Sequence, residues 1–154
     1  MIITPLDYIG FYGPKILFAS SAYLLWDQRP YLIMYVLGMI LNILLNFFLK
    51  SIIKEARPQK QIEFLDDDSL KGVNEYGMPS GHAQTSFYSI AYLLCVKSYV
   101  RDCLLIFSLF FIGTLTLYQR IKFGRHTIQQ VLVGVLVGSL FANVIYRVAK
   151  SSLE

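Results

Sequence analysis

Charged residues and cysteines are scarce in this sequence. Only 16% of its 154 residues are charged and 55% are hydrophobic, a balance far from that of a soluble domain. Its two cysteines, Cys95 and Cys103, form no framework typical of a disulfide-rich protein. No basic residue precedes Lys15, which argues against a cleaved signal peptide. In so apolar a chain, the net charge of +4 indicates anionic lipid or an anionic substrate as partner, and argues against nucleic acid.

Long apolar runs are what the sequence does have. A helix needs about 20 apolar residues to cross a membrane. Three runs approach that length and two shorter ones do so only with their flanks: 31–49, 103–118 and 128–146, then 13–26 and 82–96. We therefore predict an all-α integral membrane bundle of about five transmembrane helices, formed as one domain over residues 1–154. Residues 1–12 are interpreted as a lead into the first helix.

The second predicted helix carries a polar stripe. Asn42, Asn46, Lys50 and Lys54 follow one another at steps of four, which places them on one helix face. Polar residues within a membrane helix normally face the bundle interior. The stripe therefore indicates a polar site between the helices, and Pro58 is expected to help end this helix.

A turn-rich segment precedes the third predicted helix. Pro79 and Gly81 interrupt the preceding loop, Ser80 is a favourable N-cap residue, and His82 follows. The free N–H groups of a helix N-terminus commonly bind phosphate. Taken alone, the segment is equally compatible with a capped helix and a surface histidine.

The fourth and fifth predicted helices meet at a second basic segment. Arg120 lies at the end of the fourth helix, and the fifth carries His126, Gln130, Gly134 and Gly138 at steps of four. The two glycines predict a face that another helix can approach closely.

Crossing the membrane once per helix places the basic and imidazole groups on one side. They lie at the end of the second helix, the start of the third, the end of the fourth and the start of the fifth: Lys50 with Arg57, then His82, Arg120 and His126. Scattered placement would have divided these residues between the two sides. We therefore interpret them as one shared site.

The one long polar loop, residues 58–79, contains the acidic triplet Asp66, Asp67 and Asp68. Such a run could bind a divalent cation, but it is more typical of a solvated loop. Two imidazoles beside several cations also make a poor metal site, because the cations repel the metal. No metal or other cofactor is expected.

Phosphoryl transfer fits this set of residues better. Lysine and arginine can bind the non-bridging oxygens and offset the charge that spreads over them in the transition state. A neutral imidazole can attack phosphorus, while a protonated one supplies a proton to the leaving oxygen. Because the ordinary pKa of histidine is about 6.5, it can serve either role near neutral pH.

Three segments resemble the signature motifs of the type 2 phosphatidic acid phosphatase superfamily. They are KSIIKEARP, MPSGH and RIKFGRH, in the family's order and nearly its spacing, within roughly residues 31–146. The resemblance implies a helical membrane bundle and a metal-independent phosphatase that acts through a phosphohistidine. Position by position, it implies that His126 is the nucleophile and His82 the acid for the leaving group. It also implies a phosphate pocket made by Lys50, Arg57, Arg120, Ser80 and the Gly81 amide.

Two positions depart from the family pattern. Gln119 stands where the family usually has serine, and Gln130 where it has the aspartate that orients the nucleophilic histidine. The Gln130 carbonyl can still accept the imidazole N–H of His126, but it cannot stabilise an imidazolium as a carboxylate would. The chain is thus either a weakened or inactive enzyme or a member of a branch in which glutamine is normal. The dolichyldiphosphatase-like branch is similar, with a matching segment at 76–84 and His-Thr-x-x-Gln in its third motif.

The resemblance favours a polyprenyl (dolichyl-type) diphosphate as substrate, cleaved to the monophosphate and phosphate. Two alternatives stay open: phosphatidate or another lipid monophosphate as substrate, and a non-catalytic membrane protein that binds lipid phosphates. A soluble vanadate-dependent haloperoxidase shares the motifs, but the apolar helices argue against it. A prenyl transferase that uses the acidic triplet would need a second acidic motif, which this sequence lacks.

The resemblance also implies a site on the luminal or extracytoplasmic side of its membrane. That membrane would be the endoplasmic reticulum in a eukaryote and the plasma membrane in a bacterium. The sequence makes no prediction of oligomeric state.

Overall fold

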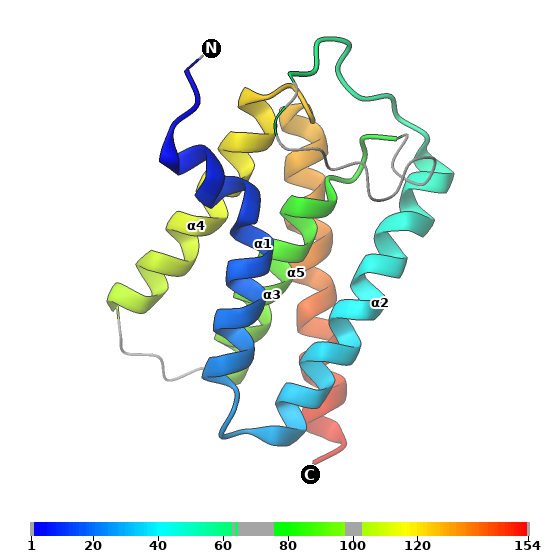
Figure 1. Ribbon diagram of the computed structural model, residues 1–154. Helices are drawn as coiled ribbons and strands as arrows, with labels where there is room; N and C mark the ends of the chain where they lie inside the picture. The colour runs from blue at the N-terminus through cyan, green and yellow to red at the C-terminus, as the bar shows by residue number, and fades with distance from the viewer. Residues whose placement is uncertain (1, 63, 65–75, 98–102, 154) are drawn as a thin grey trace.

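Within the residues that the structure describes, five helices form the bundle, as predicted. The computed structural model describes residues 2–62, 64, 76–97 and 103–153. The helices are α1 (Pro5–Leu24), α2 (Arg29–Ile53), α3 (Gly81–Val96), α4 (Cys103–Lys122) and α5 (Ile128–Ser151). α3 contacts all the other helices and so occupies the centre of the bundle, with α4 on one side and α2 on the other (Figure 1). The all-α fold class is confirmed.

α1 begins earlier than predicted. The expectation that residues 1–12 lead into a helix near residue 13 was wrong, since α1 begins at Pro5. The Thr4 backbone N–H and hydroxyl both donate to an Asp7 carboxylate oxygen, at 2.7 and 2.9 Å. A capping contact of this kind, followed by proline in the first turn, starts a helix regardless of hydropathy. The buried Asp7 also accepts from Lys122 at 2.7 Å, which ties α1 to the end of α4.

α2 ends at Ile53, four residues before Arg57, which was predicted to lie at the end of this helix. Its C-cap, Lys54, has a φ of 50°, and the helix stops at Ile53 rather than at Pro58. Lys54 therefore leaves the polar stripe and is exposed, whereas Asn42, Asn46 and Lys50 are buried as predicted. The chain then folds back toward the bundle.

α3 and α5 pack with their backbones in close contact. A Cβ on Gly134 would lie 2.6 Å from the Ser80 carbonyl oxygen, and one on Gly138 would meet the Gln84 carbonyl. The predicted small-residue face is therefore confirmed. His126 is not part of the helix, however, because α5 begins at Ile128 after the N-cap Thr127.

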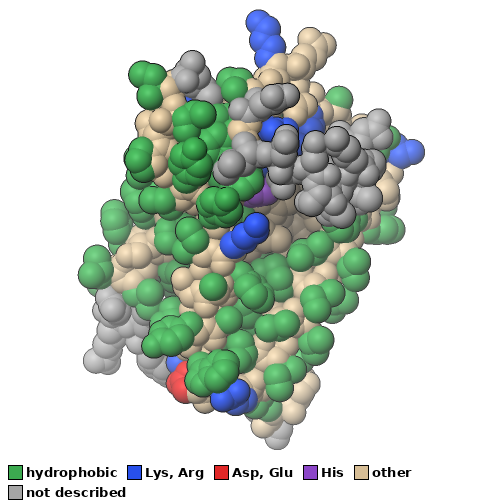
Figure 2. Space-filling view, viewed as in Figure 1, with side chains coloured by type: hydrophobic (Ala, Val, Ile, Leu, Met, Phe, Trp, Pro, Cys, Tyr) green, Lys and Arg blue, Asp and Glu red, His purple; other side chains and the backbone are tan. Residues whose placement is uncertain are grey.

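The outer faces of the bundle are apolar. Within the described ranges, three helices are long and apolar enough to cross a membrane: α2, α4 and α5. On α5, Leu132, Leu136 and Leu140 are about 60% exposed, on the face away from its glycines. Hydrophobic side chains cover much of the surface in Figure 2, and most of the basic side chains lie toward its two ends, with one near the middle. This arrangement is that of an integral membrane protein, whose outward side chains contact lipid.

Candidate active site

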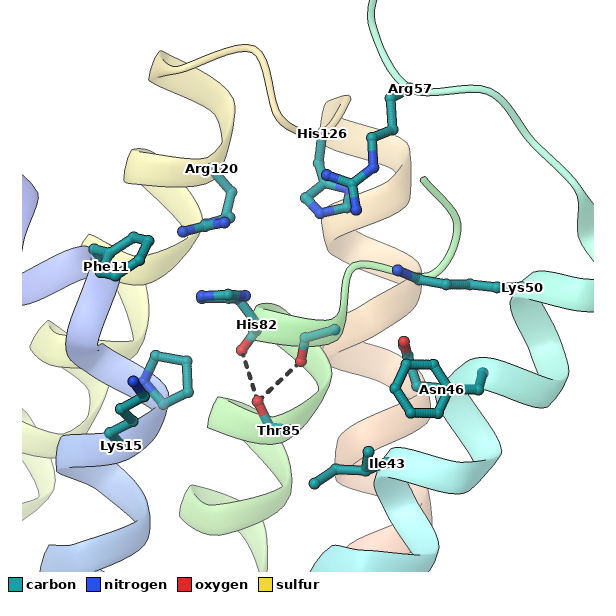
Figure 3. Close-up of a pocket in the computed structure, with 13 residues that line it drawn as sticks. Phe11, Lys15, Ile43, Asn46, Lys50, Arg57, His82, Thr85, Arg120 and His126 are labelled. Atoms are coloured by element: carbon teal, nitrogen blue, oxygen red, sulfur yellow. Dashed lines mark hydrogen bonds between the residues drawn. The ribbon is translucent and has the colours of Figure 1, made fainter. Parts of the chain in front are cut away.

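A pocket opens at the end of the bundle where α2 and α4 end and where α3 and α5 begin (Figure 3). Its volume is about 230 Å³. The lining residues come from α1, α2, the segment after α2, α3, α4 and the segment before α5: Phe11, Pro14, Lys15, Ile43, Asn46, Phe47, Lys50, Arg57, Gly81, His82, Thr85, Arg120 and His126.

Four basic side chains line the pocket, each supplied by a different segment, and the one on α1, Lys15, is exposed. Lys50 on α2 and Arg120 on α4 are only 2% and 3% exposed, and Arg57 follows α2. The Arg120 guanidinium lies over the Phe11 ring, 5.2 Å from its centroid, in a cation–π contact that helps to orient it. Buried cations concentrated in this way make a strong site for an anion.

The start of α3 enters the pocket. Gly81 and His82 line the pocket, and the His82 ring packs against the Phe11 ring with centroids 5.9 Å apart. Ser80 is the buried N-cap, and its backbone N–H donates to the Gln130 carbonyl at 3.0 Å. The Ser80 hydroxyl is buried and makes no hydrogen bond with the described part of the chain. Such a hydroxyl beside a helix N-terminus is a fitting donor to an anion.

Gln84 joins α3 to α2 beneath the pocket. Its amide nitrogen donates to the Asn42 carbonyl and side-chain oxygens, each at 2.9 Å. Its side-chain oxygen accepts from Asn46 at 2.7 Å, and Asn46 also donates to the Pro79 carbonyl at 3.2 Å. These bonds fix the turn before α3 against α2. The sequence analysis predicted that the two asparagines face the bundle interior, and it included Gln84 in the segment 76–84 without assigning it a contact.

His126 is held from behind by Gln130. The imidazole Nδ1 and the Gln130 side-chain oxygen lie 3.2 Å apart, so the predicted contact is present. That oxygen also accepts the Thr127 backbone N–H at 3.2 Å, while the Gln130 backbone N–H donates to the Thr127 hydroxyl at 3.2 Å. His126 is 4% exposed and Gln130 fully buried. The ring is therefore fixed with its other nitrogen available to the pocket.

Burial lowers the pKa of His126, and the nearby cations Arg57, Lys50 and Arg120 lower it further, to about 3. The hydrogen bond to Gln130 opposes this shift. His126 is consequently neutral at physiological pH, which is the state that a nucleophile or a base requires.

The structure brings most of the sequence-predicted site residues into this one pocket: Lys50, Arg57, Gly81, His82, Arg120 and His126. Ser80 and Gln130 lie directly behind the lining, and Gln119 is buried on α4. The acidic triplet Asp66, Asp67 and Asp68 lies outside the described residues. Over the described ranges there is no cluster of metal-ligating side chains.

Phe11 and Lys15 line the pocket but were missed from the sequence. Both lie on α1: Phe11 was assigned to the lead before the predicted helix, and Lys15 to that helix at 13–26. An aromatic residue in an apolar segment carries no signal of a functional role, because it is equally typical of a core.

An apolar groove continues from the pocket between α1 and α2. Its volume is about 430 Å³, and it shares Pro14, Lys15, Ile43 and Thr85 with the pocket. The remaining lining is apolar and consists of Phe18, Val36, Met39 and Ile40. In Figure 3, Lys15 and Ile43 lie at the side of the pocket away from Arg57. A molecule with an anionic head and an apolar tail would match this sequence of surfaces.

Comparisons with known proteins agree with the geometry. The sequence profile of the PAP2 superfamily matches residues 31–153. The chain is 32% identical over 124 residues to lipid phosphate phosphatase epsilon 1, chloroplastic, of Arabidopsis thaliana, covering 77% of this chain and 41% of that protein. It is 28% identical over 110 residues to dolichyldiphosphatase of Saccharomyces cerevisiae, covering 67% and 45%. The chain thus spans less than half the length of these curated relatives.

The fold also resembles a solved membrane protein. The crystal structure of a transmembrane PAP2 type phosphatidylglycerolphosphate phosphatase from Bacillus subtilis matches 97% of this chain and 80% of that one, with a TM-score of 0.69. Sequence identity is only 18%, so this likeness concerns the fold.

Proposed function

The chain belongs to the PAP2 superfamily, and on that premise we propose that it is a membrane lipid phosphatase that removes the terminal phosphate of a polyprenyl (dolichyl-type) diphosphate. One observation carries the proposal. Two imidazoles and four basic side chains meet in a pocket that continues into an apolar groove, which matches a phosphorylated lipid at both of its ends.

In the proposed reaction, His126 attacks the terminal phosphorus through Nε2. The phosphorus–oxygen bond to the inner phosphate breaks as the phosphorus–nitrogen bond forms. His82 gives its proton to the leaving oxygen, which releases the polyprenyl monophosphate. Water then attacks the phosphohistidine and releases inorganic phosphate, with His82 accepting a proton from that water.

The cations supply the charge stabilisation. Lys50, Arg57 and Arg120 would bind the non-bridging oxygens of the terminal phosphate. The Gly81 amide at the pocket and the Ser80 hydroxyl directly behind the lining would help. Their combined charge is available without a divalent metal, so the proposed reaction is metal-independent.

The lipid tail would lie in the groove between α1 and α2. In this pose the inner phosphate of a diphosphate lies between the pocket and the groove, next to Lys15, which lines both. A lipid monophosphate would leave Lys15 without an anion. This cation at the junction favours the diphosphate as substrate.

Phosphatidate or another lipid monophosphate is the second candidate substrate. The match to a plastid lipid phosphate phosphatase supports it, whereas the match to a dolichyldiphosphatase supports the first. A non-catalytic lipid-phosphate binder would also fit, if Gln130 cannot replace a carboxylate. All motif residues lie at one end of the bundle, and we place that end at the luminal or extracytoplasmic surface of the membrane.

Phosphate release from purified protein in detergent tests the proposal. With a chelator present, release from a long-chain polyprenyl diphosphate should exceed release from phosphatidate. Arg120→Gln should lose about 10²–10⁴-fold in rate, whereas Arg147→Gln, an exposed arginine on α5, serves as the matched control. Preference for phosphatidate would select the second candidate, and binding without release from folded protein would select the binder.

A further inference from the structure

We propose that Glu55 is a positioning residue for the nucleophile, and that His126, Gln130 and Glu55 together replace the histidine–aspartate pair that the chain lacks. The proposal rests on the function proposed above. Glu55 touches neither the pocket nor His126, and acts through Gln130.

Both the nitrogen and the oxygen of the Gln130 side-chain amide make hydrogen bonds. Its nitrogen donates to a Glu55 carboxylate oxygen at 2.8 Å and to the Ala56 carbonyl at 2.9 Å. Its oxygen faces the Thr127 backbone N–H and the His126 Nδ1, each at 3.2 Å. Both amide hydrogens and the amide oxygen are therefore engaged.

These partners permit only one orientation of the amide. Turning it over would place the amide nitrogen against the Thr127 N–H, so that two donors would face each other. It would also place the amide oxygen against the Glu55 carboxylate and the Ala56 carbonyl, so that acceptors would repel. Glu55 thus helps to hold the acceptor oxygen of Gln130 toward His126.

The fixed amide in turn fixes the imidazole tautomer. An oxygen can only accept, so His126 Nδ1 must carry the hydrogen and Nε2 must carry the lone pair. That tautomer leaves Nε2 able to attack phosphorus. A glutamine free to rotate would allow the opposite and unreactive tautomer.

The carboxylate also contributes charge. When phosphorus bonds to Nε2, the imidazole ring becomes positive. A hydrogen bond from Gln130 to the Glu55 carboxylate polarises the amide and increases the negative charge on the oxygen that faces the ring. The negative charge stands one amide farther from His126 than that of an aspartate at position 130 would.

The backbone segments around Glu55 and Gly77 pair with each other and pack on the Gln130 side chain. The Gly77 N–H donates to the Glu55 carbonyl at 2.7 Å, and Ala56 forms an isolated antiparallel bridge with Tyr76. A Cβ on Gly77 would lie within 2.6 Å of three atoms of the Gln130 amide. Any larger residue at this position would displace the amide, which indicates that the segment packs directly on it.

Glu55→Gln tests the charge without removing the contact, because its carbonyl can still accept from Gln130. We expect kcat to fall about 10–100-fold, with little change in KM, since the lipid does not touch Glu55. Asp27→Asn, at the turn between α1 and α2, is the matched control and should keep the native rate. Native kcat in Glu55→Gln would overturn the role of the charge.

An exchange of the two side chains separates positioning from a merely structural role. Gln130→Asp alone places two carboxylates in contact and should be less active than the native protein. Gln130→Asp with Glu55→Gln restores a carboxylate beside His126 and an amide behind it, and should be more active than Gln130→Asp alone. If Gln130→Asp equals or exceeds native activity while Glu55 is present, the proposal is wrong.

The tautomer can be read without any substrate. The chain has two histidines, so nitrogen chemical shifts of the labelled imidazoles can be assigned with His126→Ala. The Nδ1-protonated form of His126 should dominate in the native protein, and Glu55→Ala should raise the Nε2-protonated form.

This readout separates the two proposals. A tautomer shift in a protein that releases no phosphate would sustain the positioning role and reject the phosphatase. Phosphate release by the native protein, with an unchanged His126 tautomer in Glu55→Ala, would sustain the phosphatase and reject the positioning role of Glu55. A thermal melt of each variant in detergent identifies any that do not fold, and Glu55→Gln keeps the size of the native side chain.

Discussion

The bundle contains two contrasting helix pairs. α3 and α5 pack with backbone against backbone through Gly134 and Gly138. α3 carries His82 to the pocket, and α5 carries Gln130 to the position behind its lining. α1 and α2 are separated by an apolar groove, and bulky side chains such as Phe18 and Met39 line it. Glycines allow the close contact between α3 and α5, whereas large side chains line the groove between α1 and α2.

The difference suits the two parts of a lipid phosphate. Phosphoryl transfer requires groups held within a fraction of an ångström, and a backbone contact gives that rigidity. A long tail needs only a continuous apolar surface, for which shape matters less. The rigid pair α3 and α5 therefore suits phosphoryl transfer, and the groove between α1 and α2 suits binding of the lipid tail.

Widening the contact between α3 and α5 should have the largest effect. In Gly138→Leu, the new side chain would collide with the Gln84 backbone, and overpacking of this kind costs about 1–3 kcal/mol or more. We expect a lower melting temperature in detergent and loss of phosphate release. Leu136→Phe, on the outer face of the same helix, is the control and should change neither. Native activity in Gly138→Leu would show that the close contact is not required.

Filling the groove between α1 and α2 should affect the lipid rather than the chemistry. Ile40→Trp would occupy the groove, so kcat/KM for a long-chain substrate should fall about tenfold, the scale of one badly fitted group in an apolar pocket. A water-soluble short-chain diphosphate should react at the native rate. Equal losses with both substrates would mean that the groove does not hold the tail. Leu44→Trp, on the exposed side of α2, controls for the added bulk.

Removing the cation between the two regions should have the smallest effect. Lys15 is exposed, so one ion pair with it is worth at most about 1 kcal/mol, or roughly fivefold. Lys15→Met should therefore lower kcat/KM up to fivefold for the diphosphate and leave the monophosphate unchanged. An identical change for both substrates would remove Lys15 from any role in their discrimination.

The helices and the grouping of the motif residues could be predicted from the sequence, since both follow from local signals. Apolar runs define the helices, and alternate crossings bring their ends together. The glycine steps of α5 likewise predicted a close contact with another helix, which the structure shows to be α3. The helix ends were less accurate, because Thr4 and Asp7 start α1 by capping and Lys54 ends α2 through a left-handed backbone.

The contacts behind the pocket could not be predicted in this way. Glu55 and Gln130 are 75 residues apart, and no periodicity connects them. Their meeting depends on how the segment after α2 folds over the start of α5, which is a tertiary property. Phe11 and Lys15 were missed for the same reason, since their role comes from the position of α1 beside α3 and α4.

The central claim is that His126 carries the phosphoryl group, and trapping that intermediate tests it most directly. Protein mixed with diphosphate lipid labelled at the terminal phosphate should be quenched in alkali within a single turnover. We predict label on the native protein that is stable to alkali, lost in acid and absent from His126→Ala. Native protein that releases phosphate without ever becoming labelled, or His126→Ala that becomes labelled as well, would contradict the account.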